Sequence, residues 1–256
     1  MKIPIFPLNL VLFPGQILPL NIFEERYKLM LQRCLQERTG FGVALIKQGR
    51  QERGPPATPY SIGTIAQIVQ VDEQQGGNFA LLCKGENRFR ISALERNTAE
   101  YLQAEVEIFP DEAVAPPALL MVAQRVSQLF DEYYRGMIAM MGGWQKEISP
   151  GGRTWLFDPL IIGERHQRLV EARAGEATGV SHLMIPTLPD DPASLSFVVA
   201  AELNVGLDVK QDLLEAPSAL ARLQKEAEVL TADMPSIEER VRSAQRQRLT
   251  ATEQMN

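Results

Sequence analysis

The chain has few of the side chains that usually bind metals or act as nucleophiles. Only two cysteines and two histidines occur among its 256 residues. Cys34 and Cys83 each stand among apolar residues, so we expect reduced thiols in a hydrophobic core and no disulfide framework. His166 and His182 have no cysteine or further histidine at ligand spacing, which leaves a zinc site without support. We therefore predict no metal and no cofactor.

The sequence also lacks the short motifs of common hydrolases and nucleotide-binding enzymes. No Gly-Lys dipeptide occurs, which excludes the phosphate-binding Walker A loop, and no G-x-S-x-G nucleophile elbow is present. The adjacent carboxylates Asp111–Glu112 and Asp190–Asp191 flank prolines, where helix capping and turn formation account for them. We therefore predict that the chain is not an enzyme. A hydrolase without a linear motif stays open as a minor alternative.

Long apolar runs and basic charge are missing as well. No apolar run approaches the ~18 residues that a membrane-spanning helix needs. The N-terminus resembles a secretory signal in having Lys2 before apolar residues, but four prolines within the first 20 residues argue against that. The net charge of -6 gives no general attraction to phosphate backbones. These absences predict a cytoplasmic protein with no membrane partner, and they count against a nucleic-acid partner.

What is present is ordinary for a globular protein, with 45% hydrophobic residues, enough to form a core. Residues 1–110 read as short strands around one helix. Phe23, Tyr27, Met30, Leu31 and Cys34 repeat at helical spacing, with Asn21 as the expected N-cap and Gly40 as the expected stop. Prolines before residue 20 confine that part to short edge strands, and further strands are predicted at 41–46, 62–69, 79–84, 88–93 and 101–109. These elements predict a compact, mostly antiparallel barrel.

The second half reads as helical. A proline-rich linker at 110–118 separates it from the strands, so we predict two domains, 1–110 and 118–256. An apolar stripe from Leu119 predicts one helix that ends at Gly142–Gly143, before an irregular stretch at 144–165. Asp191–Pro192 predicts the start of another helix. Ser236 and Glu239 form a capping box that predicts the start of a last one.

Several segments carry a family resemblance. They are Pro7–Leu8, Phe13–Pro14–Gly15, Leu18–Pro19–Leu20, Phe23–Glu24, Arg26–Tyr27, Gly63–Thr64–Ile65–Ala66, 81–85, Arg88–Phe89–Arg90–Ile91, 101–107, Asp191–Pro192, Lys210–Gln211, Leu213–Leu214–Glu215 and Arg222–Leu223. In this the chain resembles the LON domain, the N-terminal substrate-recognition region of Lon proteases. The resemblance covers 1–110 and 190–232, and 136–188 is an unmatched insertion.

The resemblance implies an α+β fold: a PUA-like β pseudo-barrel with one packed helix, then a C-terminal helical bundle. It further implies a free-standing, non-enzymatic module that binds unfolded or misfolded polypeptide and lacks the ATPase and protease domains. PUA-like barrels also bind RNA, so an RNA-binding module is the alternative function, against which the acidic charge counts.

The insertion supplies the candidate docking residues. Met140, Met141, Trp144, Trp155 and Phe157 cluster in sequence near glycines. Methionine adapts its shape and aromatic rings supply contact energy, which suits recognition of apolar peptides. A competing interpretation is core packing, because Met137 and Met140 continue the stripe that begins at Leu119.

Overall fold

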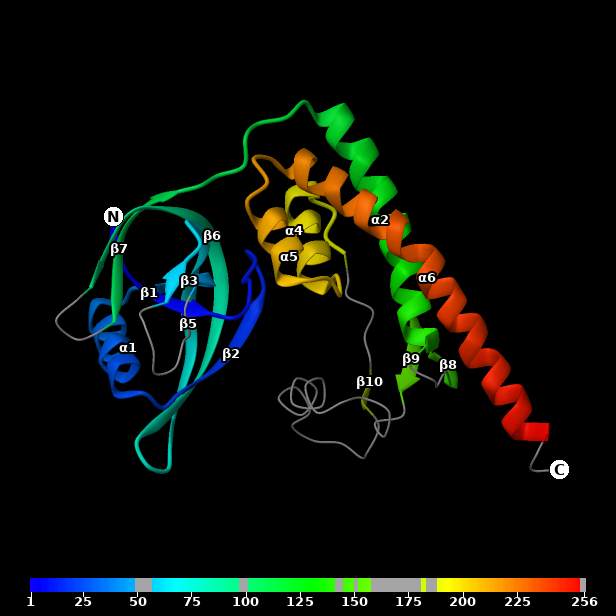
Figure 1. Cartoon of the computed structure of the whole chain (residues 1–256), viewed down its shortest axis with the longest axis horizontal. Coiled ribbons are helices and arrows are strands. Elements are labelled where there is room, and N and C mark those ends of the chain that lie inside the picture. The colour runs from blue at the N-terminus through cyan, green and yellow to red at the C-terminus, as the bar shows by residue number, and fades with distance from the viewer. Residues whose placement is uncertain are drawn as a thin grey trace. The chain divides into compact units, whose positions relative to one another are not determined.

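The computed structural model describes residues 1–48, 57–96, 101–140, 145–149, 152–157, 181–182 and 188–253 (Figure 1). The chain forms two compact units, 1–123 with 189–226 and 124–188 with 227–256. Residues 189–226 therefore belong to the same unit as the strands. The predicted division into domains 1–110 and 118–256, separated by a linker, stays a prediction. Among the described residues, no helix is long and apolar enough to cross a membrane.

A closed ring of strands forms the body of the first unit (Figure 1). The strands are β1 (Lys2–Leu8), β2 (Ile17–Ile22), β3 (Phe41–Gln48), β4 (Thr58–Pro59), β5 (Ile62–Gln74), β6 (Asn78–Arg96) and β7 (Leu102–Ile108). Neighbours pair in the order β1-β7-β6-β5-β3, and β1 pairs with β3 to close the ring. All these pairings are antiparallel except β1 with β3, so the predicted, mostly antiparallel barrel is confirmed.

β1 was expected at a sheet edge because of its prolines, and that expectation is wrong. The strand pairs with β7 through Lys2–Ile5 and with β3 through Ile5–Leu8. Pro4 therefore has a register partner only on β7, and Pro7 only on β3. A proline lacks one N–H, so each interrupts at most one ladder and the strand stays inside the ring.

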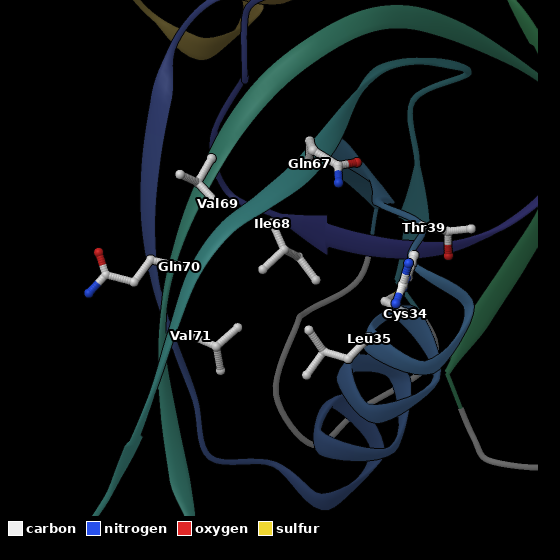
Figure 2. A pocket seen from close by; sticks show the side chains of 9 residues that line it. Cys34, Leu35, Thr39, Gln67, Ile68, Val69, Gln70 and Val71 are labelled. Carbon is white, nitrogen blue, oxygen red and sulfur yellow. The ribbon is translucent and has the colours of Figure 1, made fainter.

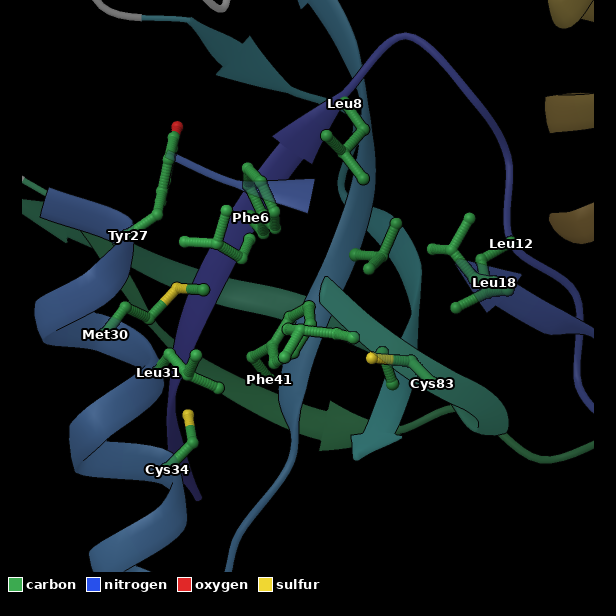
Figure 3. Packing of buried hydrophobic residues seen from close by; sticks show 14 of the residues in the cluster. Phe6, Leu8, Leu12, Leu18, Tyr27, Met30, Leu31, Cys34, Phe41 and Cys83 are labelled. Atoms are coloured by element: carbon green, nitrogen blue, oxygen red, sulfur yellow. The ribbon is translucent and has the colours of Figure 1, made fainter. Parts of the chain in front are cut away.

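One helix covers the hydrophobic core between β1, β2 and β6. In α1 (Glu25–Glu37) the buried residues are Tyr27, Met30, Leu31 and Cys34, as the helical stripe predicted. They pack with side chains from several strands, including Phe6 and Phe41 (Figure 3). The N-cap is Glu24 and not the predicted Asn21, because Asn21 still pairs with Ala80 as part of β2.

β6 is one long strand where the sequence predicts two. The predicted break lies near Gly85, yet the strand runs from Asn78 to Arg96. A Cβ at Gly85 would collide with the carbonyl oxygen of Phe13. The Gly85 N–H donates to Gln16 O at 2.8 Å, and the Gly15 N–H donates to Gly85 O at 2.8 Å. The glycine thus permits a close backbone contact and does not end the strand.

Three helices from the later part of the chain belong to the first unit: α4 (Pro192–Glu202), α5 (Leu207–Leu214) and the start of α6 (Ala219–Glu253). The predicted cap of α4 is confirmed, because Asp191 Oδ2 accepts a hydrogen bond from the Ser194 N–H at 2.9 Å. α5 is tied to the barrel by the Gln211 side chain, which donates to Ile62 O at 3.0 Å. The predicted combination of a β barrel and a helical C-terminal part is therefore confirmed.

The second unit contains most of α2 (Pro116–Met140), the rest of α6 and a small sheet. α2 contains the predicted helix from Leu119. The sheet is formed by β8 (Gln145–Ser149), β9 (Gly152–Phe157) and β10 (Ser181–His182), so the prediction of irregular structure at 144–165 is wrong for its strands. A new helix was predicted to start at Ser236, but α6 continues through Pro235. Leu230 and Ile237, on either side of this proline, are both buried and belong to one apolar stripe.

Candidate functional site

β5 loses one of its two neighbours halfway along its length. β3 pairs with it only from Val43↔Thr64 to Phe41↔Ala66, whereas β6 accompanies it to Gln74. In the described part of the chain, no strand pairs with residues 67–74 on the edge away from β6. In a β-strand, the N–H and C=O groups of alternate residues point to opposite edges. Alternate residues of 67–74 therefore present backbone groups at a free edge.

A groove of about 270 Å³ lies beside this free edge. Its lining comes from the end of α1 and from β5: Cys34, Leu35, Arg38, Thr39, Gln67, Ile68, Val69, Gln70 and Val71. Figure 2 shows Ile68 and Val71 pointing from β5 toward Leu35 on α1, and Gln70 pointing away. The β5 part of the lining begins directly after Ala66, the last residue of β5 that pairs with β3. The groove therefore lies where the β3–β5 pairing would continue if β3 were longer at that end.

The end of α1 is shaped to form one wall of the groove. Arg38 takes the left-handed conformation with φ 52°, and the Thr39 N–H donates to Cys34 O at 2.9 Å. The predicted helix stop, Gly40, serves a different purpose. A Cβ at Gly40 would lie 2.5 Å from Ala66 O, so only glycine lets the chain pass this close to β5. The close passage holds the last turn of α1 next to the strand.

A β-bulge at Val69 forms the other wall. The β5–β6 register passes from Ile68↔Cys83 to Gln70↔Leu82 and leaves Val69 without a partner. In a regular strand, Ile68 and Val71 would lie on opposite faces, because side chains alternate. The extra residue restores them to one face, toward α1, and leaves the Val69 side chain 59% exposed.

The groove offers contacts and no reactive group. Burial raises the pKa of the Cys34 thiol to about 11, and burial raises that of the neighbouring Cys83 to about 12. Both thiols are therefore protonated at neutral pH and are poor nucleophiles. The described residues contain no group of three or more side chains suited to a metal ion. The arrangement suits binding through apolar contact and backbone hydrogen bonds.

A buried ionic cluster elsewhere in the first unit gives Asp111 a different role from the expected one. Asp111, expected to form a turn or cap, accepts from Arg88 Nη2 at 2.6 Å and from Arg222 Nη2 at 2.7 Å. Arg88 Nη1 also donates to the carbonyl oxygens of Leu214, at 2.6 Å, and Ala216, at 2.7 Å. Burial lowers the pKa of Arg88 to about 10, and Asp111 opposes that shift. The cluster fastens β6 to the helices and lies outside the groove.

Comparison with known proteins identifies this combination of barrel and helices. The family model of the ATP-dependent protease La (LON) substrate-binding domain matches residues 2–232. The chain belongs to this family. The match runs across 136–188, the segment predicted to be an insertion. The resemblance inferred from the sequence motifs is confirmed.

Solved structures show the LON fold directly. A Lon N-terminal domain protein from Xanthomonas campestris superposes with a TM-score of 0.55 at 21% identity, covering 88% of this chain and 96% of that chain. The N-terminal domain of Lon protease from the Mycobacterium avium complex gives a TM-score of 0.52 at 18% identity, covering 90% and 98%.

Curated relatives are Lon proteases. Lon protease 2 from Syntrophobacter fumaroxidans is 22% identical over 238 residues, which is 93% of this chain and 25% of the relative. The Lon protease from Anaeromyxobacter dehalogenans is 24% identical, over 89% of this chain and 23% of the relative. The chain thus spans about a quarter of the length of these relatives.

None of the docking residues predicted from the sequence is among the residues that line the groove. Met141 and Trp144 lie outside the described residues. Met140 is the last residue of α2, and Trp155 and Phe157 are positions on β9, opposite Lys146 and Ser181. These five stay a prediction. No motif in the sequence of this LON domain predicts the groove itself, although Leu35 is a signal as an apolar residue beside the α1 stripe.

Proposed function

We propose that this LON domain recognises unfolded or misfolded polypeptide segments and catalyses no reaction itself. Its family is defined by substrate binding, which supports the first part. The observation that carries the proposal is the groove between α1 and β5. There apolar side chains lie at the surface, and the thiol that lines the groove is protonated.

The exposed apolar groups indicate what kind of client fits. Leu35 is 44% exposed and Val69 is 59% exposed, so both gain by being covered. Burial of apolar surface contributes about 25 cal/mol per Å². A folded client keeps its own apolar residues inside, whereas an unfolded segment offers them. The groove therefore favours unfolded chains.

Binding of a permanently unfolded client tests the proposal. Reduced, carboxymethylated lysozyme carrying a fluorescent label should bind saturably, as measured by anisotropy, and native lysozyme should not compete. An RNA oligonucleotide serves as the competitor for the alternative function. Displacement of the unfolded client by RNA at lower concentration than by unlabelled client would replace the proposal with RNA binding. ATP-stimulated turnover of casein that survives repurification would refute its non-catalytic part.

A second contact region is proposed from the sequence alone. Trp144 and Trp155 are the only tryptophans in the chain, so intrinsic fluorescence reports on this region. Addition of an apolar client peptide should shift the emission to the blue, and changing both residues to alanine should weaken capture with little change in the melting temperature. If the double variant unfolds, both tryptophans are core residues and the region is not a docking surface.

A further inference from the structure

We infer that the client segment binds by adding a strand to the free edge of β5, next to residues 67–74, with one side chain in the groove. This inference rests on the proposed function and specifies its binding mode. The occupant is an extended polypeptide with apolar residues at alternate positions and a basic residue near one end.

The first argument for strand addition comes from the backbone of β5. Residues 67–74 are paired with β6 on one edge, and in the described chain no strand covers the other. Proteins usually protect such an edge with proline, with charged side chains, with a bulge, or with a helix or loop that covers it. Residues 67–71 contain no proline and no charged residue. They do contain the bulge at Val69, and the end of α1 lies beside them with the groove in between. Outward-facing N–H and C=O groups there complement those of an extended chain.

The second argument comes from the size and lining of the groove. With about 270 Å³ it is smaller than the roughly 300–1,000 Å³ of sites for drug-sized ligands, so it suits a side chain better than a cofactor. In an extended segment every second side chain faces the same side. A strand added in line with β3 would place such a side chain between Leu35 on α1 and the two apolar residues of β5 that point toward it, Ile68 and Val71.

Charge selects among extended segments. Asp72 and Glu73 are exposed and follow the uncharged stretch of the edge directly. The Gln70 amide donates a hydrogen bond to Asp72 Oδ2 at 2.8 Å. A lysine or arginine opposite this end of the edge is attracted, and an acidic residue is repelled. The net charge of -6 adds to this preference.

N-methylated peptides test the binding mode without changing the protein. The probe is a labelled ten-residue peptide in which valine alternates with threonine and ends in two lysines. Two further versions carry N-methyl groups on alternate amides, offset from each other by one residue. A strand pairs through every second amide, so one methylated version should lose binding and the other should keep it. In hydrogen exchange, amides within 67–74 should gain protection on binding. Equal binding of both methylated versions would overturn strand addition.

Surface variants test whether the peptide binds at the groove and the β5 edge. The double variant Leu35→Lys/Val69→Lys puts charge on the groove and on the bulge, at side chains already exposed. The matched control is Leu94→Lys, since Leu94 is 42% exposed on β6. We expect the double variant to bind the valine peptide at least about tenfold more weakly, with an unchanged melting temperature, and the control to bind as the wild type does.

The outcomes separate the two proposals. If the wild type binds neither peptide nor unfolded lysozyme, both the proposed function and strand addition are wrong. If unfolded lysozyme binds but the double variant binds it equally well, only strand addition at β5 is wrong. A concentration-dependent dimer that Val69→Lys abolishes would assign the edge to a second copy of this chain and would likewise overturn the inference.

Discussion

Replacement of Asp111 by alanine should strongly destabilise the barrel. The change removes the carboxylate shared by Arg88 and Arg222, whose side chains are 2% and 0% exposed. Two buried guanidinium groups would then lose the carboxylate that they share. Loss of one partner from a buried ion pair costs about 3–5 kcal/mol. A domain of this size loses about 2–4 °C of melting temperature per kcal/mol, so the shift should be roughly 6–20 °C. Because Asp111 is 20% exposed, we expect the lower half of that range.

Scanning calorimetry measures the shift, with Glu112→Ala as the control for loss of an adjacent, exposed carboxylate. The double variant Asp111→Ala/Arg222→Met should be less destabilised than the sum of its single changes, because it removes an unpaired cation together with its partner. A melting temperature within about 2 °C of the wild type for Asp111→Ala would refute the reasoning, since it would mean that water reaches the two arginines and replaces the carboxylate.

Three further results are expected. Burial raises the pKa of Glu226, whose carboxylate oxygens have no hydrogen-bond partner among the described residues, so the folded state binds its proton more tightly than the unfolded state. The free energy of unfolding should therefore fall as pH rises above about 4.5, and Glu226→Gln should remove this fall in urea titrations at pH 4.5–7. Cys34 and Cys83 should react with a thiol reagent at pH 8 only after unfolding; fast reaction in the native state would contradict their burial. Gly40→Ala should lower stability by about 1–3 kcal/mol through contact with Ala66 O, and an unchanged unfolding midpoint would show that the backbone shifts freely there.

The features that local pattern could predict are those whose determinants are neighbours in sequence. The α1 stripe follows from a 3.6-residue period, and the cap at Asp191 follows from two adjacent residues, Asp191 and Pro192. The parallel β1–β3 pairing that closes the ring has no such signal, since it joins strands whose register is set by the whole barrel. Between the predicted strands 79–84 and 88–93 lies Gly85, and a glycine gives the same signal whether it ends a strand or allows a close contact.

The groove could not be predicted from the sequence for a related reason. Its walls are Leu35, which lies off the buried stripe of α1, and a bulge that shifts Val71 to the face of Ile68. An alternating pattern cannot show a one-residue insertion in a strand that is apolar on both faces. Arg88 and Asp111 are 23 residues apart, and Arg222 follows Asp111 by a further 111, so no motif spacing connects them.

The discontinuity of the first unit sets an order of events during synthesis. The ring of strands is made from the first 108 residues, but the helices that complete the unit begin after residue 188. Arg222 follows Asp111 by 111 residues, which a ribosome adds in roughly 6–22 s at 5–20 residues per second. During that interval Arg88 has neither the carbonyls of Leu214 and Ala216 nor the second arginine beside it. In the nascent chain the Arg88 side chain therefore stays hydrated, and the ionic cluster stays incomplete, until the residues up to Arg222 have left the ribosome.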